Sequence, residues 1–423
     1  MTAQSKTVAV IGAGIVGSCT AAYLQREGCN VILIDRDEPG SQASYGNAGS
    51  VSPSAIMPVA MPGMLKKVPS WLLDPKGALR LRWWYAPVAL PWLLRFLKHG
   101  RPDEVRRIAA AMRSLLADVF EAYEPLIDQA NARDLIRRNG CLYVYETEED
   151  MKAGAFSLQV RRDNGAILEP VGEYELRQME PALGKQFRFG LYAPENGSTL
   201  DPQRLTAAIA RSVVAAGGRS VRANVRSVRS LESGLEINGD GEAIRVDSVV
   251  IAAGAWSKAL ARQLGDDLPL ETQRGYHATV PAPNVSPSRT VMWPQRNLMA
   301  NPMAMGLRFA GTVELAGLQA APDMRRARAL LDLGCQLFPE LRPQEPKYWM
   351  GHRPCFPDSL PVIDHARLDR RVFYAFGHQH VGMCGAATTG RAVAALVTGR
   401  QPSLDISPFS ARRFGHAAGE VQA

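Results

Sequence analysis

Apolar and polar positions along the chain form segments that predict strands and helices in turn. Near the N-terminus, residues 7–11 are an unbroken β-branched apolar run, which predicts a buried strand. A helical pattern follows to about Glu27 and is closed by Gly28. A second apolar run at residues 31–34 predicts another strand, which ends in Asp35. The pattern therefore predicts strand, helix and strand in the first part of the chain.

A glycine turn joins the first strand to the helix and reads GAGIVG from Gly12 to Gly17. Gly12 permits the tight turn, Gly14 lets the backbone approach a pyrophosphate, and Gly17 lets the helix lie close to the strand. The helix N-terminus, with Ile15 and Val16, then faces the phosphates. Strand, glycine turn and helix in this order predict a dinucleotide-binding βαβ unit.

The second strand ends in an acid followed by a base. Asp35 is placed to accept hydrogen bonds from ribose hydroxyls, which argues against a 2′-phosphate at that point. Arg36 beside it weakens that argument, and we place both residues in the predicted site. The βαβ unit alone does not separate FAD from NAD.

Residues 53–100 have a different pattern, dense in proline, leucine and tryptophan. An apolar run at residues 83–94 is too short to span a bilayer and is interrupted by proline. Cations surround this run, at Arg80, Arg82, Arg95, Lys98 and Arg101. Such an element can lie in a membrane interface, where a quinone would be available as electron acceptor. A substrate lid or a subunit contact is the alternative.

Composition and charge narrow the class of protein. The 423 residues are 46% apolar and 21% charged, as in folded proteins of two domains, or of one domain with a large insertion. The net charge of +8 has no long basic tract or nucleic-acid-binding motif behind it, so we expect no nucleic-acid partner. The six cysteines show no paired spacing, which predicts neither disulfides nor a metal site. These features and an N-terminus without a secretory pattern favour the cytoplasm, with the inner face of the membrane as a peripheral location.

Three further segments resemble the D-amino-acid oxidase-like family of FAD-dependent oxidoreductases, and most closely its bacterial D-amino-acid dehydrogenase branch. The first is residues 41–52, SQASYGNAGSVS. In that family a loop of small residues at this place contacts the pyrophosphate and the flavin. The residues that carry over are Ser44, Asn47, Ala48, Gly49 and Ser50.

The second segment runs from Asp201 to residues 248–257, which read SVVIAAGAWS. The resemblance implies that the backbone of Val225 contacts the adenine, and that Ala253, Gly254 and Trp256 lie at the cofactor.

The third segment covers residues 351–363 and 373–390. It resembles a strand pair followed by a glycine-rich turn that opens the last long helix beside the flavin. The residues implied at the cofactor are Arg353, Gly377, His380, Val381 and Gly382. Ser359, Asp364 and His380 depart from the family pattern, which puts the fine shape around the flavin in doubt.

The resemblance covers essentially the whole chain and implies its fold and cofactor. The expected fold is α/β, with an FAD-binding Rossmann-like domain of glutathione-reductase type and a second α+β domain carrying an antiparallel substrate sheet. We assign residues 1–60, 196–262 and 350–423 to the first domain, and 61–195 and 263–349 to the second. FAD is preferred to NAD because an NAD-dependent enzyme does not ordinarily return at its C-terminus to complete the dinucleotide site.

The resemblance also indicates how a substrate is held. Arg353 is the candidate carboxylate clamp, since a planar guanidinium matches a carboxylate in two parallel hydrogen bonds; a structural role on its strand is the alternative. Arg308 is a second candidate for binding the carboxylate, and a surface ion pair with an acidic residue is the alternative. Tyr276 could cover the substrate or bind its carboxylate, and a purely structural role in the packing of the sheet is the alternative. His277 is among several histidines near these segments, and we assign no catalytic base.

The implied reaction is FAD-dependent oxidative deamination of D-amino acids to 2-oxo acids and ammonia, with hydride transfer to the flavin and electrons passed to a quinone or another acceptor. One alternative is oxidation of secondary amines of the D-proline, hydroxyproline, sarcosine or glycine type on the same fold. Another is a flavin-bearing subunit of a multi-chain dehydrogenase. The pocket that distinguishes these alternatives is not visible in the sequence.

Overall fold

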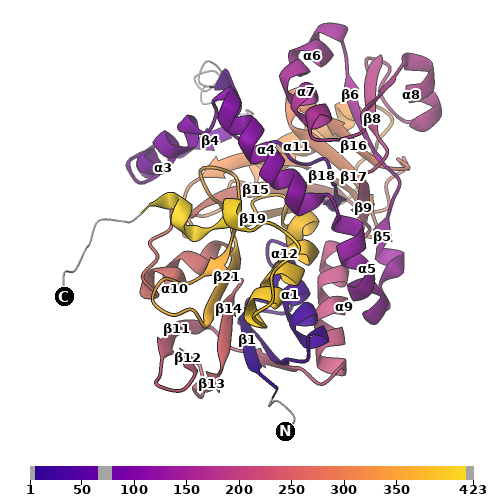
Figure 1. The fold of residues 1–423 in the computed structure, drawn as a ribbon. Helices are drawn as coiled ribbons and strands as arrows, with labels where there is room; N and C mark the ends of the chain where they lie inside the picture. Colours follow the sequence, from indigo (N-terminus) through magenta and orange to yellow (C-terminus); the bar gives the residue numbers. More distant parts are fainter. Residues whose placement is uncertain (1–4, 65–78, 416–423) are drawn as a thin grey trace.

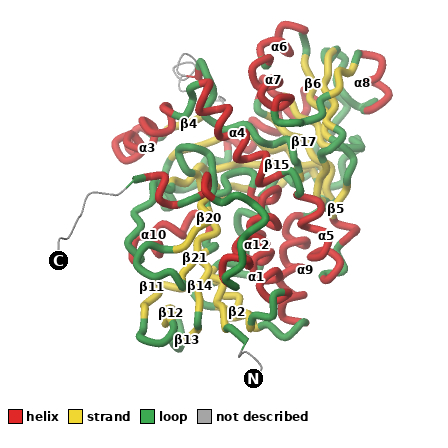
Figure 2. The backbone as a smooth tube through the Cα atoms, in the orientation of Figure 1, coloured by secondary structure: helices red, strands yellow, loops and turns green. Residues whose placement is uncertain are grey.

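The structure is a computed structural model that describes residues 5–64 and 79–415. Residues 65–78, which belong to the proline- and tryptophan-rich segment 53–100, lie outside the described residues. Figures 1 and 2 show two large sheets, with helices packed around and between them.

A six-stranded sheet forms the lower half of the molecule in Figure 1, with the order β10-β2-β1-β14-β21-β20. It is parallel except for β20, which pairs antiparallel with β21. The strands are β1 (Thr7–Ile11), β2 (Asn30–Asp35), β10 (Arg219–Arg222), β14 (Ser248–Ile251), β20 (Val362–His365) and β21 (Val372–Phe376). The predicted first strand is confirmed at both ends, and the second includes Asp35 as predicted.

Helices cover one face of this sheet. The first, α1 (Ile15–Arg26), ends one residue before the predicted boundary and packs against α12 (Gly382–Val397). The two helices approach closely at Gly390, where an added Cβ would lie 2.8 Å from the carbonyl carbon of Cys19. The same apolar core takes in α4 (Pro102–Leu116), α5 (Val119–Gln129) and α9 (Pro202–Ala215).

A small antiparallel sheet and a short helix cover the other face. The sheet consists of β11 (Val225–Ser230), β12 (Leu235–Gly239) and β13 (Ile244–Val246), and the helix is α10 (Ser257–Gln263). The three strands follow one another along the chain, pair antiparallel and directly precede β14.

The second large sheet has nine strands, in the order β19-β15-β18-β17-β16-β6-β8-β7, with β4 paired to β18. Most of its pairs are antiparallel, as expected for a substrate sheet. The strands are β4 (Leu79–Leu81), β6 (Cys141–Tyr145), β7 (Glu169–Val171), β8 (Phe189–Ala193), β15 (Glu271–Val280), β16 (Thr290–Trp293), β17 (Leu298–Met303), β18 (Gly306–Leu315) and β19 (Lys347–Cys355). Helix α11 (Arg325–Leu337) packs on one face.

The remaining elements are short. A three-stranded sheet joins β3 (Ser50–Val51), β9 (Gly197–Thr199) and β5 (Ile136–Arg137). Three helices lie near the nine-stranded sheet: α6 (Glu148–Ala153), α7 (Ala155–Asp163) and α8 (Glu173–Met179). Helix α3 (Ala86–Lys98) projects from the body of the molecule in Figure 1.

The fold class is the predicted one, with a nucleotide-binding α/β half and a largely antiparallel second half. Strand β19 crosses the predicted boundary between residues 349 and 350, pairs with β15 of the nine-stranded sheet along its whole length, and forms one further bridge from Cys355 to His378. The domain limits therefore stay a prediction. In the described part of the chain, no helix combines the length and apolar character needed to cross a bilayer, and all six cysteines are free thiols.

Candidate active site

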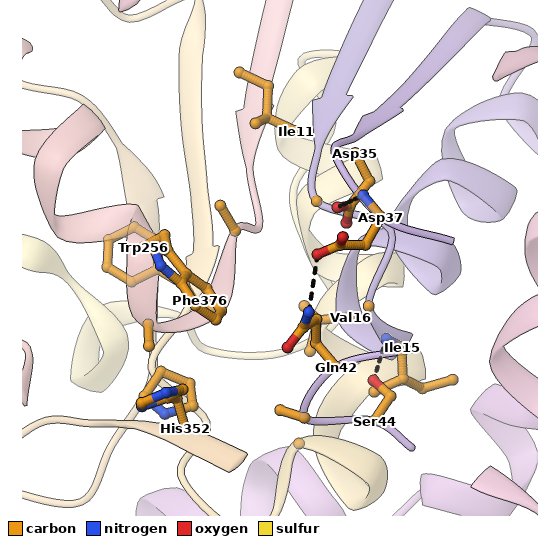
Figure 3. A pocket seen from close by; sticks show the side chains of 18 of the residues that line it. Ile11, Ile15, Val16, Asp35, Asp37, Gln42, Ser44, Trp256, His352 and Phe376 are labelled. Carbon is orange, nitrogen blue, oxygen red and sulfur yellow. Dashed lines mark hydrogen bonds between the residues drawn. The ribbon is translucent and has the colours of Figure 1, made fainter. Parts of the chain in front are cut away.

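A cavity of about 430 Å³ opens at the carboxyl ends of β1, β2, β14 and β21, where a doubly wound sheet binds its ligands. In Figure 3, Trp256, Phe376 and His352 line one side, and Asp35 and Ser44 lie opposite them. The predicted cofactor residues that line it are Gly12, Gly14, Ile15, Val16, Asp35, Arg36, Ser44, Asn47, Val225, Ala253, Gly254, Trp256, Gly377 and Gly382. Four segments far apart in the sequence therefore meet in one place.

The glycine turn has the geometry that its three glycines require. Gly12 has a φ of +109°, and a Cβ added there would lie 2.4 Å from the Ala252 carbonyl oxygen. A Cβ at Gly17 would lie 1.8 Å from the Gly12 carbonyl oxygen, so Gly17 allows α1 to pack on the turn without lining the cavity itself. At Gly14 the nearest atom to an added Cβ is 3.5 Å away, and the bare backbone faces the cavity.

The side chains of Asp35 and Ser44 hold the glycine turn in place through hydrogen bonds to its backbone. One carboxylate oxygen of Asp35 accepts the Ala13 N–H at 2.6 Å, and the other accepts the Asp37 N–H at 3.0 Å. Burial raises the pKa of Asp35, while these two N–H donors oppose the shift. The Ser44 hydroxyl accepts the Ile15 N–H at the start of α1, at 3.0 Å. Each carboxylate oxygen retains a lone pair for a ribose hydroxyl.

An aromatic wall closes the other side of the cavity. The Arg36 guanidinium lies 4.2 Å from the centre of the Trp256 ring, and Trp256 meets His352 edge-on at 5.6 Å. Burial and the nearby Arg274 and Arg36 lower the pKa of His352 to about 4, so its imidazole is neutral at pH 7. Sequence reasoning did not assign His352 to the site, although it directly precedes Arg353.

These residues fit FAD. The turn and the α1 N-terminus offer backbone N–H groups to a pyrophosphate, and the Asp35 carboxylate suits a ribose. Gly14 and Gly254 leave the backbone bare at the cavity, and no atom lies within 4 Å of a Cβ added at Gly254. Trp256 and Phe376 supply flat apolar surface for a ring system.

The loop at residues 45–49 connects the cavity to the nine-stranded sheet. Arg308 on β18 donates from one nitrogen, Nη1, to the carbonyl oxygens of Tyr45 and Asn47, each at 2.7 Å. Its Nε donates to the Thr279 hydroxyl at 3.2 Å, while Nη2 has no partner among the described residues. Arg308 is only 1% exposed, and burial lowers its pKa to about 10. The surface ion pair considered for Arg308 is wrong, and the side chain supports this loop.

Two more side chains of the same sheet hold the loop. His277 on β15 donates from Nδ1 to the Gly46 carbonyl oxygen at 3.2 Å, and its ring stacks on Trp349 at 5.1 Å. Burial and the Arg308 charge lower the pKa of His277 to about 3, so the ring is neutral. Asn301 on β17 donates to the Ala48 carbonyl oxygen at 3.0 Å. The predicted residues Ala48, Gly49 and Ser50 therefore lie beside the cavity without lining it.

Tyr276 lies on the opposite face of β15, since successive side chains of a strand alternate. It is 1% exposed, and its hydroxyl donates to the Glu314 carboxylate and accepts the Asp323 N–H at 3.0 Å. The pKa of Tyr276 is raised to about 12, by burial first and by Glu314 second. These contacts favour packing over a contact with substrate.

Arg353 lies on the face that carries His277. Arg353 pairs with Gln273 and Trp349 pairs with His277 across β19 and β15, and paired residues share a face. The guanidinium donates to the carbonyl oxygens of Thr312 at 3.1 Å and Gly311 at 3.3 Å. Among the described residues no carboxylate lies within ion-pair distance of it, and burial lowers its pKa.

His380 and Val381 precede α12 and do not line the cavity. The His380 side chain is exposed to water. The cofactor role predicted for His380 and Val381 stays a prediction.

Comparison with known proteins identifies the family. A family model described as FAD dependent oxidoreductase (DAO) matches residues 7–396. A D-amino-acid oxidase of Bradyrhizobium diazoefficiens is 42% identical, with 97% of this chain and 99% of the relative covered. A D-amino acid dehydrogenase of Dechloromonas aromatica is 31% identical, with 95% and 99% covered.

A solved structure with the same fold is glycine oxidase from Geobacillus kaustophilus. It superposes with a TM-score of 0.73 at 22% identity and covers 97% of this chain and 99% of its own. The family match, the two relatives and the cavity that fits a dinucleotide agree with one another. The chain belongs to the DAO family of FAD dependent oxidoreductases, and its cofactor is FAD.

Proposed function

We propose that this enzyme oxidatively deaminates D-amino acids to 2-oxo acids and ammonia. The relatives named D-amino-acid oxidase and D-amino acid dehydrogenase, each matched over nearly its full length, support this substrate class. The observation that carries the proposal is Arg353. It lies on the face of the nine-stranded sheet that carries His277, and its guanidinium has no acidic partner among the described residues. A planar guanidinium in that position is suited to a substrate carboxylate.

The residues divide the work as follows. Bound FAD supplies the hydride acceptor for the α-hydrogen of the substrate. Arg353 holds the carboxylate, so that the α-carbon is presented in one orientation. The resulting imine takes up water and releases ammonia, which leaves the 2-oxo acid. We assign no catalytic base, because a substrate amine that has already lost its proton to water needs none.

The neutral histidines fit this scheme. Burial holds the pKa of His277 at about 3 and that of His352 at about 4. Both imidazoles are therefore uncharged at neutral pH. One ring nitrogen of each histidine, Nδ1, is already used, in His277 by the Gly46 carbonyl and in His352 by the Thr272 hydroxyl at 2.9 Å. They position the loop and the wall of the cavity.

Anaerobic mixing with substrates tests the proposal. The purified yellow enzyme is mixed with D- and L-amino acids, glycine, sarcosine and D-proline, and loss of flavin absorbance is followed. We expect bleaching by D-amino acids, and a rise in the required concentration of roughly ten- to a hundredfold in Arg353→Ala, since a charge-assisted pair is lost. No bleaching by any amine would refute the proposal.

A second candidate is oxidation of glycine or of secondary amines such as sarcosine and D-proline. The likeness to glycine oxidase supports it at the level of fold. These substrates share the carboxylate that Arg353 would bind, so the same panel separates the candidates by rate. Full flavin content without turnover of any amine would instead favour a subunit that needs partner chains.

We further propose that the electrons leave to a quinone at a membrane surface, on the inner face of the cell membrane. The support is the arm, which we define as residues 79–98, comprising β4, the turn Trp83–Tyr85 and α3. Trp83 is 86% exposed, and other large apolar side chains of the arm also face water. They are Trp84, Val88, Leu90 and Leu94.

The positive charge of the arm favours an anionic bilayer as its partner, and side-chain contacts hold the arm to the nine-stranded sheet. The arm contains the cations Arg80, Arg82, Arg95 and Lys98 and no acidic residue. Trp92 and Phe96 of α3 stack at 5.1 Å and pack against Cys355 at the end of β19. Arg82 donates to the buried Glu314 carboxylate at 2.8 Å. The arm is therefore fixed to the strand that carries Arg353.

A further inference from the structure

The strand pair beside Arg353 contains an irregularity that the reaction scheme does not use. Strands β15 and β18 pair Tyr276 with Gly311 and then Gly275 with Val313, so their register shifts by one residue at Thr312. Thr312 has a φ of +43°, which a β-branched residue rarely adopts. This is a β-bulge, the device by which strands redirect groups next to functional sites.

The bulge supplies the acceptors for Arg353. In a regular antiparallel ladder, carbonyl groups point toward the neighbouring strands and are used by them. At the bulge, the Gly311 and Thr312 carbonyls accept hydrogen bonds from the two terminal nitrogens of Arg353, at 3.3 and 3.1 Å. The guanidinium has five N–H donors, so this contact fixes its plane and leaves donors for a ligand.

To reach the bulge on β18, Arg353 must cross β15, which lies between β18 and β19. It crosses at Gly275. A Cβ added to Gly275 would lie 2.4 Å from the Arg353 Cζ, 2.5 Å from Nη2 and 2.7 Å from Nε. Gly275 does not have a positive φ, so glycine is required there for space and not for backbone conformation.

The far side of the bulge is held by the protein core. Arg326 of α11, itself buried, donates to the Thr312 hydroxyl and to the Val313 carbonyl oxygen. Tyr276 and Arg274 contact Glu314 on the same face. Thr312 is therefore held on one side by Arg326, which binds its hydroxyl, and on the other by Arg353, which binds its carbonyl oxygen.

We propose that Gly275 and the Thr312 bulge are positioning elements that aim the Arg353 guanidinium at the substrate carboxylate. The proposal rests on the carboxylate role of Arg353 given under Proposed function. Gly275 then contributes to substrate affinity although glycine has no side chain to touch the substrate. A substitution at Gly275 should change that affinity only while Arg353 is present.

A double-mutant cycle on the FAD-loaded enzyme tests this. The variants are Gly275→Ala, Arg353→Ala and the pair, with Gly172→Ala as matched control because no atom lies within 4 Å of a Cβ added there. Benzoate and its uncharged isostere benzamide are titrated while the flavin spectrum is followed. Flavin content and melting temperature check each fold.

We expect Gly275→Ala to weaken benzoate binding roughly tenfold or more, since charge-assisted hydrogen bonds are misaligned, and to leave benzamide binding unchanged. The double variant should bind benzoate no more weakly than Arg353→Ala alone. An unchanged benzoate affinity in Gly275→Ala, with a weakened one in Arg353→Ala, would overturn the positioning role and leave the proposed function intact. An unchanged benzoate affinity in Arg353→Ala would overturn the carboxylate role of Arg353 on which the proposed function rests.

The double variant also covers a failure to fold. If Gly275→Ala does not fold while Gly275→Ala/Arg353→Ala folds with its flavin, the conflict lies with the guanidinium and the proposal is supported. If neither folds but Arg353→Ala does, Gly275 serves the strand itself and the proposal is wrong.

Discussion

At the scale of single residues, β15 shows why a site can be located from sequence more easily than its members can be assigned. Tyr276 and His277 were predicted within the domain that carries the antiparallel sheet, and both lie on a strand of that sheet. Its two faces could not be told apart, because nine of the ten β15 residues are buried and no alternation of polarity marks an outside. Gly275 and His277 face the 45–49 loop, whereas Arg274 and Tyr276 face the core.

The glycine turn was predictable residue by residue for the opposite reason. The roles of Gly12, Gly14 and Gly17 follow from local backbone geometry, which the spacing alone encodes. The role of Arg308 depends on a contact with residues more than 260 positions earlier, and no local pattern reports such a contact.

Arg308 offers a test of that contact. In Arg308→Lys the charge stays, but the fork to the Tyr45 and Asn47 carbonyls is lost. We expect the dissociation constant of FAD, measured by reconstitution of apoprotein, to rise about tenfold, and the visible spectrum of the bound flavin to shift. Arg188→Lys, on an exposed ion pair, serves as control. Weaker benzoate binding with unchanged FAD affinity would return Arg308 to a substrate role.

At the scale of elements, the boundaries predicted from local patterns lay close to the observed ones, whereas the orientation of the elements could not be predicted from the sequence. The first strand and first helix ended within a residue of prediction. The basic, tryptophan-rich segment was recognised, but which side chains of α3 face water depends on the core under Trp92 and Phe96. That core includes Cys355, far along the chain, so sequence spacing does not reveal it.

The arm can be tested with vesicles. Trp83→Ser/Leu94→Ser removes two exposed apolar side chains and leaves every charge in place. We expect the wild type to float with vesicles containing phosphatidylserine, less so in high salt, and the variant to bind at least tenfold more weakly (about 1.4 kcal/mol) because less apolar area is buried. Tyr174→Ser, exposed on α8, is the control. If Trp83→Ser/Leu94→Ser binds the vesicles as tightly as Tyr174→Ser does, a lid or a subunit contact is favoured.

At the scale of the whole molecule, the resemblance predicted two halves, and the pairing of strands decides how they join. Strand β19 belongs to the nine-stranded sheet, yet its residues His352 and Pro354 line the FAD cavity. The sequence could not place a boundary there, because one strand serves both halves. The order of strands in the nine-stranded sheet was likewise inaccessible, since it is set by pairings such as β6 with β16 between distant segments.

Buried histidines give the whole molecule a predicted acid sensitivity. His277 and His378 are each 2% exposed, and burial lowers both pKa values to about 3. Unfolding frees them to titrate near 6.5, so the unfolded chain takes up protons below that pH while the folded chain does not. Each histidine should therefore contribute a loss of stability of about 1.4 kcal/mol per pH unit as the pH falls from 6.5 toward 3.

Melting temperatures at pH 7.5, 6.0 and 5.0 measure this loss. His378→Gln should show a smaller drop between pH 7.5 and 5.0 than the wild type, whatever its absolute melting temperature. His99→Gln, at a partly exposed ion pair with Glu104, controls for the substitution. The same drop in His378→Gln and wild type would contradict the assignment of a neutral buried ring.

The order of the six-stranded sheet also bears on how the protein is made. Strand β1 lies beside β14, which lies beside β21, and α12 packs on α1, so neighbours in space come from distant parts of the chain. At ordinary rates of translation, about 20 to 70 s pass between the synthesis of β1 and that of β21. During that interval the first strands leave the ribosome without the partners that cover them. A newly made chain therefore depends on protection from aggregation until its last helix is released, and only then can it retain its flavin.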